Sequence, residues 1–301
     1  MNFDNFDDSI GVDGYYKIIR SKFFPNESPD SFNIAGFHAE EQIFRKGTVF
    51  SRVRKLNNHE VNEFLNGNIK NSDFFPPQPD KVEVKEGRFN AKNNVVLYVA
   101  DHPYVAINEC EVKCGDYFLL SFLSLQKDMC FLHIHEGKDE LSSILYSLFK
   151  ANDKRFYPVI NLIYSNLLSF DKYHGIAYDS VKVPIGYKNS KFGTVESVTN
   201  IAISSDNIKD IRLEASWLEF YGRDDVIFEH AIFIPLSKKK NKKIRKIFYS
   251  ENKDVFIETS NCIKSEMNLK KDRNKILLDK GCVNEFNKPP MLFVKKDNPV
   301  I

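Results

Sequence analysis

Apolar residues recur at two different periods along this chain of 301 residues, and each period predicts a different kind of element. Alternation at every second position, with β-branched and aromatic residues, is typical of half-buried strands, and short apolar runs between turn residues are typical of buried ones. On this basis we expect strands at 48–55, 94–101, 116–125, 127–137, 175–181 and 200–203. Two further alternating segments, 212–222 and 225–236, predict a hairpin.

Apolar positions three and four residues apart predict helices elsewhere. Leu and Ile recur at this spacing in 140–153 and in 156–170. Shorter helices are expected at 59–68 and at 102–112, where Pro103 suits the first turn of a helix. This mixture of elements predicts an α+β fold with a mixed or antiparallel core sheet and helices beside it.

The two ends of the chain differ in character from its middle. Residues 1–46 are polar, and we expect a partly ordered N-terminal arm that docks through Phe and Ile side chains. Beyond about residue 206 come the hairpin, a basic run at 238–246 and short strand-like pieces such as 255–260. We therefore divide the chain into an arm, a central domain at 47–205 and a C-terminal extension at 206–301.

Bulk composition narrows the class of protein. The chain is 42% hydrophobic and 28% charged, as globular proteins are. Its formal net charge of +2 gives no global sign of a nucleic-acid-binding protein. The first residues form no secretory signal, and no apolar run reaches the length of a membrane span. The odd, scattered set of five cysteines predicts reduced thiols in a cytoplasmic protein.

Two residues near the strand at 94–101 suit the binding of a nucleotide. Arg88 lies between a Gly and an Asn just before the strand, and its planar, permanently charged fork suits a diphosphate. A surface arginine that caps a turn fits the same pattern. Tyr98 lies in the middle of the strand and offers a ring for stacking, although a core aromatic is the more common use of such a residue.

A carboxylate and a hydroxyl complete the candidate set. Glu109 follows the same strand by one short helix, and a carboxylate there can stabilise the positive charge that forms when a glycosidic bond breaks. A solvated helix residue is the alternative, and Glu111 competes for the same role. Ser180 ends the strand at 175–181, where it suits hydrogen bonding to a carboxamide or ribose; Tyr178 and Asp179 flank it and share the position.

Arginines in the first strand give a second candidate for a phosphate ligand. Arg52 and Arg54 are two residues apart and therefore share one face of that strand. Either one suits the role, and ordinary exposed strand residues would follow the same pattern. The sequence alone leaves the choice between them open.

Other patterns are too weak to predict a site. His133 and His135, with Cys130 and Glu136 nearby, lack the clear spacing of a zinc site, so we expect no metal. The basic run carries no interleaved aromatic residues, which argues against nucleic-acid binding and favours a solvated loop. Neither a P-loop nor a GxGxxG motif is present, which argues against a Rossmann site and a kinase-like ATPase.

Taken in order, these segments resemble a known family. The Pro-rich loop before Arg88, the GRFN turn, a strand with Tyr98 and Ala100, and a helix with Ala106 and Glu109 follow one another as they do in the RES domain family. The segments HGIAYDS and TNIAI are similar to its later strands. The resemblance covers roughly residues 47–205, and the named motifs depart from it at His174, where an aspartate is common, and in a closing strand without an aromatic end.

The resemblance implies a fold, a substrate and residue roles. RES domains have a split β-sheet core with flanking helices, similar to ADP-ribosyltransferases, and many are toxins of bacterial toxin–antitoxin modules that consume NAD. It implies that Arg88 and Arg52 hold the diphosphate, Tyr98 stacks on nicotinamide or its ribose, Ser180 orients the substrate, and Glu109 stabilises the developing charge. NAD would be the substrate and a protein antitoxin the partner.

Two alternatives remain beside NAD hydrolysis or phosphorolysis. The same pocket suits mono-ADP-ribosylation of a protein target, because the acceptor is chosen at the rim of the pocket. A non-catalytic module that binds nucleic acid or protein is the alternative of another class, and it predicts binding that weakens steeply with salt and no turnover of NAD.

Overall fold

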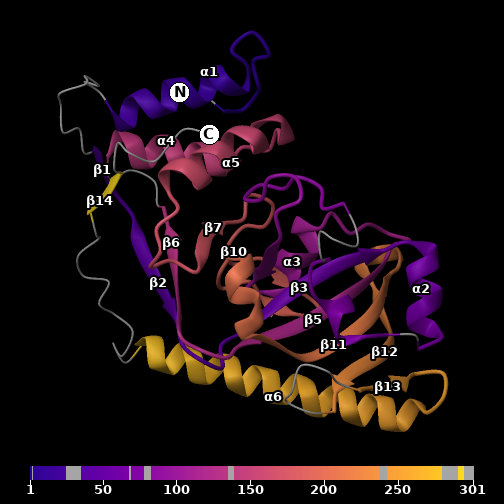
Figure 1. Cartoon of the computed structure of the whole chain (residues 1–301). Helices are drawn as coiled ribbons and strands as arrows, with labels where there is room; N and C mark the ends of the chain where they lie inside the picture. The colour runs from indigo at the N-terminus through magenta and orange to yellow at the C-terminus, as the bar shows by residue number, and fades with distance from the viewer. Residues whose placement is uncertain are drawn as a thin grey trace.

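The computed structural model of the chain describes residues 1, 3–24, 35–67, 69–77, 83–134, 139–236, 243–279 and 291–294. They form a mixed α+β fold built on one ten-stranded sheet (Figure 1). In sheet order the strands are β13 (Ile244–Phe248), β12 (Ile227–Pro235), β11 (Ile211–Tyr221), β5 (Tyr117–Leu125), β3 (Val49–Leu56), β4 (Val96–Ala100), β10 (Thr199–Ser204), β7 (Gly175–Asp179), β6 (Met129–His133) and β2 (Glu40–Phe44).

Two smaller pairings and six helices accompany the sheet in the described part of the chain. β1 (Ala35–His38) pairs with β14 (Met291–Val294), and β8 (Lys188–Asn189) pairs with β9 (Gly193–Thr194). The helices are α1 (Gly11–Phe23), α2 (Asn58–Leu65), α3 (Pro103–Glu109), α4 (Glu140–Phe149), α5 (Tyr157–Leu167) and α6 (Lys253–Asp279). Short 3₁₀ turns are η1 (Asn71–Phe74), η2 (Lys154–Phe156), η3 (Ser205–Asp210) and η4 (Arg223–Asp225).

The sheet consists of two halves that meet at a single paired position. β3 pairs with β5 along its whole length, from Val49 to Leu56, whereas its pairing with β4 is limited to Ser51 and Ala100. On the other side, β4 pairs with β10 from Val96 to Ala100. Because β3 and β4 diverge on leaving their one contact, their side chains border an opening between the two halves.

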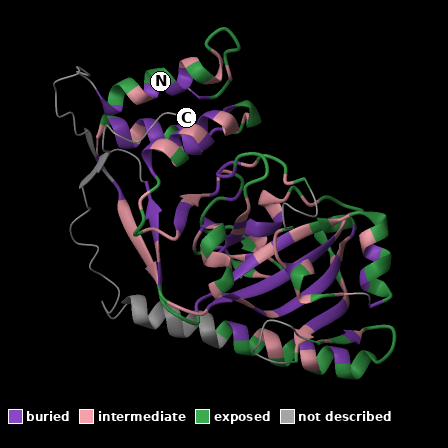
Figure 2. Ribbon diagram, in the orientation of Figure 1, coloured by how far each residue is buried: buried purple, intermediate pink, exposed green. Residues whose placement is uncertain are grey.

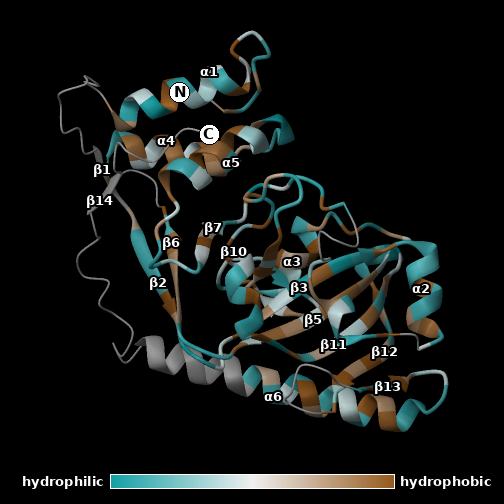
Figure 3. Cartoon of the chain, in the orientation of Figure 1, coloured by the Kyte–Doolittle hydropathy of each residue, from teal (hydrophilic) through white to brown (hydrophobic). Residues whose placement is uncertain are grey.

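Helices cover the two halves differently. α1, α4 and α5 pack together beside β6 and β7, where Ile19, Leu145 and Ile160 are fully buried (Figure 1). α6 lies along β12, β13 and β3 at the other end of the molecule. Figure 2 shows the central strands as mostly buried, and Figure 3 shows apolar and polar residues mixed along α2 and α6, as expected for helices with one solvated face.

The core beneath α3 fixes that helix against the sheet. Val105, Ala106 and Ile107 of α3 are buried in a cluster with Phe122 and Trp217. The two aromatic rings meet edge to face, with centroids 5.4 Å apart. Burying a large apolar side chain stabilises the fold by about 1.5–3 kcal/mol, so this packing holds the short helix although seven residues alone would not be stable.

The structure confirms the strands and helices expected in the middle of the chain. β3, β4, β5, β6, β7 and β10 lie where alternation and apolar runs predict them, and α2 to α5 lie where the three- and four-residue spacing predicts them. The predicted hairpin is β11 and β12. It is continuous with the main sheet, because β11 pairs with β5 from Ile211 to Phe220.

Outside the middle of the chain, one prediction is wrong and others are refined. The segment 255–260 was expected to be strand-like, but it forms the first turns of α6, because Phe256, Ser260 and Met267 fall on one buried face of a helix. The predicted arm docks through Phe and Ile side chains as expected, and it also contributes α1 and the sheet strand β2. The division into three parts stays a prediction.

Two expectations lie partly or wholly outside the described residues. Of the basic run at 238–246, residues 238–242 fall there, and the rest leads into β13, where Lys246 Nζ donates to the carbonyl oxygen of Gly67. His135 and Glu136 also fall there. Within the described part of the chain, no helix is both long enough and apolar enough to span a bilayer.

Candidate functional site

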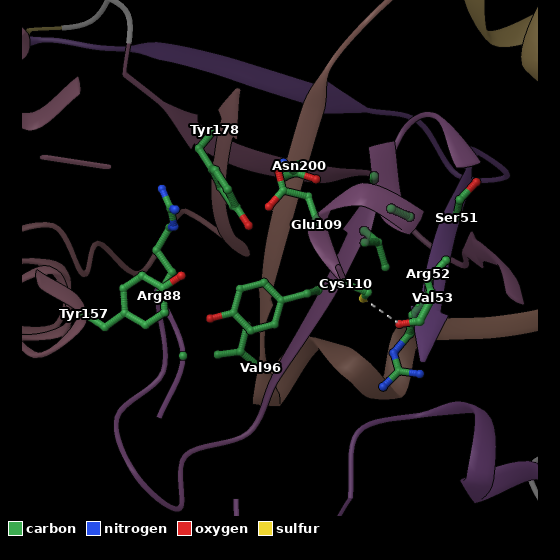
Figure 4. A pocket seen from close by; sticks show the side chains of 15 residues that line it. Ser51, Arg52, Val53, Arg88, Val96, Glu109, Cys110, Tyr157, Tyr178 and Asn200 are labelled. Atoms are coloured by element: carbon green, nitrogen blue, oxygen red, sulfur yellow. Dashed lines mark hydrogen bonds between the residues drawn. The ribbon is translucent and has the colours of Figure 1, made fainter. Parts of the chain in front are cut away.

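A pocket of about 310 Å³ opens where β3 and β4 diverge (Figure 4). Residues from β3, β4, α3, α5, β7, β10 and the turn before β4 line it. They are Ser51, Arg52, Val53, Gly87, Arg88, Val96, Tyr98, Val99, Ala100, Ala106, Glu109, Cys110, Tyr157, Tyr178 and Asn200. Arg52, Arg88, Tyr98 and Glu109 therefore lie around one cavity, as the resemblance implies.

Glu109 is the last residue of α3 and its carboxylate is held from two strands. Oγ of Ser180 donates to Oε1 of Glu109 at 2.6 Å, and Nδ2 of Asn200 donates to the same oxygen at 3.2 Å. Among the described residues, no hydrogen bond occupies Oε2. The carboxylate is therefore fixed in direction by one oxygen, while the other is available to a ligand in the pocket.

Ser180 supports the glutamate from the end of β7. It is buried, its N–H donates to the carbonyl of Val198 at 2.8 Å, and its Oγ accepts from the N–H of Lys182 at 3.1 Å. Both bonds leave the hydroxyl hydrogen for Glu109. Ser180 is thus close to the expected site, but behind the carboxylate and not on the pocket wall.

Tyr178 and Asp179, the residues of β7 that precede Ser180, point to opposite faces of the sheet. Tyr178 lines the pocket, and burial raises the pKa of its hydroxyl well above the ordinary value, with Tyr98 and Glu109 acting in the same direction. Asp179 lies on the other face, with Oδ1 3.6 Å from Nε2 of His133. Of the two flanking candidates, only Tyr178 shares the site with Ser180.

The structure separates Glu109 from its competitor Glu111. The helix ends at Glu109, and Glu111 has a positive φ of 52° that turns the chain outward. Its carboxylate lies 3.1 Å from Nζ of Lys182 and 3.5 Å from Nζ of Lys154. Lys182 and Lys154 hold the pKa of Glu111 below its usual value. Glu111 is a surface residue in ion pairs, and Glu109 is the residue of the pocket.

The turn before β4 positions Arg88 inside the fold. The N–H of Gly87 donates to the carbonyl of Asn90 at 3.0 Å, and any side chain at residue 87 would clash with the amide of Asn90. The guanidinium of Arg88 donates to the carbonyl of Phe149, the last residue of α4, and at 3.1 Å to that of Ala151. These bonds orient the cation and leave other N–H groups free to meet an anion.

Aromatic rings surround the guanidinium of Arg88. Its Cζ lies 5.5 Å from the ring centre of Tyr157 and 5.7 Å from that of Tyr178. Such contacts stabilise a partly desolvated cation by about 0.5–2 kcal/mol. Figure 4 shows Arg88 and Tyr157 at one end of the pocket, opposite Arg52, with Glu109 between them.

Tyr98 has a defined structural task in addition to bordering the pocket. Its hydroxyl accepts from the N–H of Phe89 at 2.8 Å and donates to Oδ1 of Asn90 at 2.9 Å. Burial raises its pKa far above the ordinary value of a tyrosine. Because the hydroxyl holds the GRFN turn, only the ring of Tyr98 is available for the stacking that the sequence predicts.

The second arginine of the site is Arg52 and not Arg54. Arg52 lines the pocket and donates to the carbonyl of Phe74 at 3.3 Å. Burial lowers its pKa to about 10, so it stays charged at neutral pH. Arg54 instead donates to the backbone carbonyl of Asp73 at 2.7 Å and pairs with the carboxylate of Glu60. The two share a strand face, but the pair with Glu60 keeps Arg54 out of the site.

Asn200, Tyr157 and Cys110 also line the pocket, although none of them was named among the site residues expected from the sequence. Asn200 sits at a buried position of an apolar strand, and a buried amide needs partners, so its position was a usable signal. Tyr157 begins α5 and carried no such signal. Cys110 follows Glu109 directly; its thiol donates to the carbonyl of Val53 at 3.2 Å, and burial raises its pKa to about 11. The thiol is neutral at pH 7, which makes it a poor nucleophile.

The described residues contain no group of three or more His, Cys, Asp and Glu side chains arranged to hold a metal ion.

Comparisons of the chain with protein-family models, with curated proteins and with solved structures find no match. What the site does must therefore be argued from its own geometry.

Proposed function

We propose that this chain binds NAD in the pocket and breaks the bond between nicotinamide and ribose. The observation that carries the proposal is the position of Glu109: a carboxylate fixed by Ser180 and Asn200, in a cavity with an arginine at each end. Such a cavity suits a substrate that carries both a diphosphate and a centre that becomes positive during the reaction.

Glu109 stabilises the positive charge that develops at the anomeric carbon as nicotinamide departs. Its two hydrogen-bond donors prevent the carboxylate from turning away, so little reorganisation is needed during the reaction. Nicotinamide leaves as a neutral molecule from a pyridinium, so no general acid is required. Water or inorganic phosphate then takes its place at the ribose.

The arginines bind the charged part of the substrate. Arg88 is oriented by two carbonyls and keeps donors for the diphosphate, and Arg52 supplies a second cation across the pocket. The rings of Tyr98 and Tyr178 border the space between them and suit stacking on nicotinamide or its ribose. This set supports substrate positioning and electrostatics as the source of catalysis.

The wider proposal follows the resemblance to RES domains. The opening between the two halves of the sheet supports an ADP-ribosyltransferase-like split core. We propose further that the protein acts as a cytoplasmic toxin that depletes NAD, and that a protein antitoxin blocks this pocket. The described cysteines are free thiols, which supports a reducing compartment.

The test is release of nicotinamide from NAD by the purified protein. Glu109→Gln keeps the shape of the side chain and removes its charge, so we expect turnover to fall by roughly 100-fold or more with no loss of unfolding temperature. Glu111→Gln is the matched control, two residues away and outside the pocket, and should retain full activity.

Other outcomes separate the alternatives. Transfer of labelled ADP-ribose from NAD to a protein band would replace hydrolysis by mono-ADP-ribosylation while keeping the site. Equal activity of the two glutamine variants would reject the role of Glu109. Absence of any turnover, with binding that weakens steeply with salt, would favour a non-catalytic binding module.

A further inference from the structure

A second pocket of about 540 Å³ lies against the first. Its walls consist mainly of hydroxyl, amide and aromatic or aliphatic side chains, among them Phe89, Asn94, Asn161, Ser165 and Ser204. Glu86 is the one charged residue among those that line it in the described part of the chain.

Three separate segments pass from one pocket directly into the other. In the turn before β4, Gly87 and Arg88 line the first pocket, and their neighbours Glu86 and Phe89 line the second. At the start of α5, Tyr157 lines the first and Pro158 the second. Val96 of β4 belongs to both walls. The two pockets are therefore adjacent, and the turn that carries Arg88 lies between them.

The turn between the pockets is held firmly in place. Nδ2 of Asn161 donates to the carbonyl of Gly87 at 3.0 Å, to that of Asn90 at 3.2 Å and to the carboxylate of Glu86 at 3.0 Å. Tyr98 holds the same turn from the side of the first pocket. A ligand that crosses this turn would meet a fixed backbone with a cation beside it.

The size and chemistry of the two pockets indicate which ligand would cross the turn that carries Arg88. Ligand pockets of proteins run from about 300 to 1,000 Å³, so the first pocket, at about 310 Å³, has room for little more than one nucleoside half of a dinucleotide. The second pocket has hydroxyls and amides for a ribose and a base, and the ring of Phe89 beside them. Its lining lacks Lys and Arg among the described residues, which disfavours a phosphate group there and suits an uncharged nucleoside.

Resting on the proposed function, we propose that the second pocket is the adenosine subsite of the same NAD molecule. The nicotinamide–ribose half then lies at Glu109, the adenosine half lies among Asn94, Ser165 and Ser204, and the diphosphate crosses the turn beside Arg88. This arrangement explains why the strongest phosphate ligand of the site stands on the boundary between the two cavities.

The test compares two substrates that differ only in the adenosine half. Ser165→Phe places a ring into the second pocket from an exposed helix position. We expect the KM for NAD to rise about 10-fold or more, while kcat/KM for nicotinamide mononucleotide, which has no adenosine, changes less than about 2-fold. Asn62→Phe, at an exposed position of α2 outside both pockets, should change neither value.

Folding and binding are measured beside turnover. If thermal unfolding shows that Ser165→Phe is destabilised, Ala91→Phe fills the same pocket from an exposed turn position. Calorimetric binding of AMP reports the subsite without any reaction, and the filled variants should weaken it about 10-fold or more.

Failure of this inference and failure of the proposed function look different. An intact reaction in which both filled variants leave the KM for NAD unchanged, or affect the two substrates equally, overturns the adenosine subsite alone. A protein that binds AMP, and loses that binding in the filled variants, but releases no nicotinamide keeps the subsite and loses the proposed reaction. A native protein that binds no AMP overturns the subsite.

Discussion

Two groups of side chains on different parts of the sheet differ in which partners their carboxylates have. Beneath α6, Nζ of Lys191 lies 2.7 Å from Glu219 and 3.0 Å from Glu229, and Nζ of Lys264 lies 2.7 Å from Glu229. Ser260 donates a further hydrogen bond to Glu229 at 3.1 Å. Two ammonium groups thus compensate two carboxylates inside the protein.

The carboxylate of Glu109 differs from these in the charge of its partners. Its partners are neutral donors, Ser180 and Asn200, and in the described part of the chain no Lys or Arg forms an ion pair with it. Leaving a carboxylate without a cation costs stability, which a purely structural cluster avoids. The cluster under α6 therefore has cations of its own beside its carboxylates, whereas Glu109 has none in an ion pair with it, and we propose that positive charge reaches Glu109 with a ligand.

Among the changes that test this contrast, we expect Lys191→Met to have the largest effect, a loss of folding stability. Lys191→Met removes a cation from Glu219, which is almost fully buried, and should lower the free energy of unfolding by about 3 kcal/mol. Urea unfolding measures the change. Nicotinamide release per folded molecule should stay the same, because the cluster does not line the pocket.

The control for Lys191→Met is a change in an exposed ion pair of similar geometry. Lys92 lies 2.6 Å from Glu83, with side chains 67% and 66% exposed, so Lys92→Met should cost less than about 0.5 kcal/mol. The double variant Lys191→Met with Glu219→Gln should recover part of the loss, because it removes the uncompensated charge. Equal costs at Lys191 and Lys92 would contradict a buried, balanced cluster.

The next effect concerns activity and not stability. Ser180→Ala removes the shorter of the two hydrogen bonds to Glu109, and a hydrogen bond to a charged group contributes about 1.5–3 kcal/mol. We therefore expect nicotinamide release to fall about 10- to 100-fold, mainly through kcat. Ser197→Ala serves as the control, since this serine pairs with Thr199 and does not contact Glu109. A change in KM alone would mean that Ser180 contacts substrate and does not position the carboxylate.

Local pattern was sufficient to predict much of this site. Alternation placed Tyr98 in a strand, the Gly before Arg88 marked a tight turn, and Ser180 stood at the end of an apolar run. These features are set by neighbours in the chain. The convergence of the residues depends on strand pairing across long separations, and it was expected only from the resemblance to a family.

The sequence could not separate some neighbouring candidates, because the choice depends on where a helix ends and on contacts with other elements. Glu109 and Glu111 are two residues apart, and only the end of α3 at Glu109 separates pocket from surface. Arg52 and Arg54 share a face, and the choice follows from Glu60, a residue of another element. The segment 255–260 has the β-branched and aromatic composition of a strand, but the longer pattern around Phe256 and Met267 favours a helix.

The smallest effect is a pH dependence of the cluster under α6. Burial alone would raise the pKa of Glu229, but Lys191 and Lys264 outweigh it and hold the pKa below its ordinary value of 4.5. A carboxyl whose folded pKa is lowered contributes stability that is fully present above its unfolded pKa. That contribution is lost as the pH falls through the folded value.

Lys264→Met should therefore destabilise the protein near pH 7 and have almost no effect below the folded pKa of Glu229. Because Lys264 is 43% exposed, the expected cost near neutral pH is only about 0.5–1 kcal/mol. Urea unfolding of both proteins at about pH 7 and at a pH below the folded pKa of Glu229, located by an NMR titration of that carboxyl, gives the comparison. A difference that stays constant between the two pH values would mean that Lys264 acts through the packing of its stem on Trp217, over whose ring its ammonium lies at 5.9 Å, and not through Glu229.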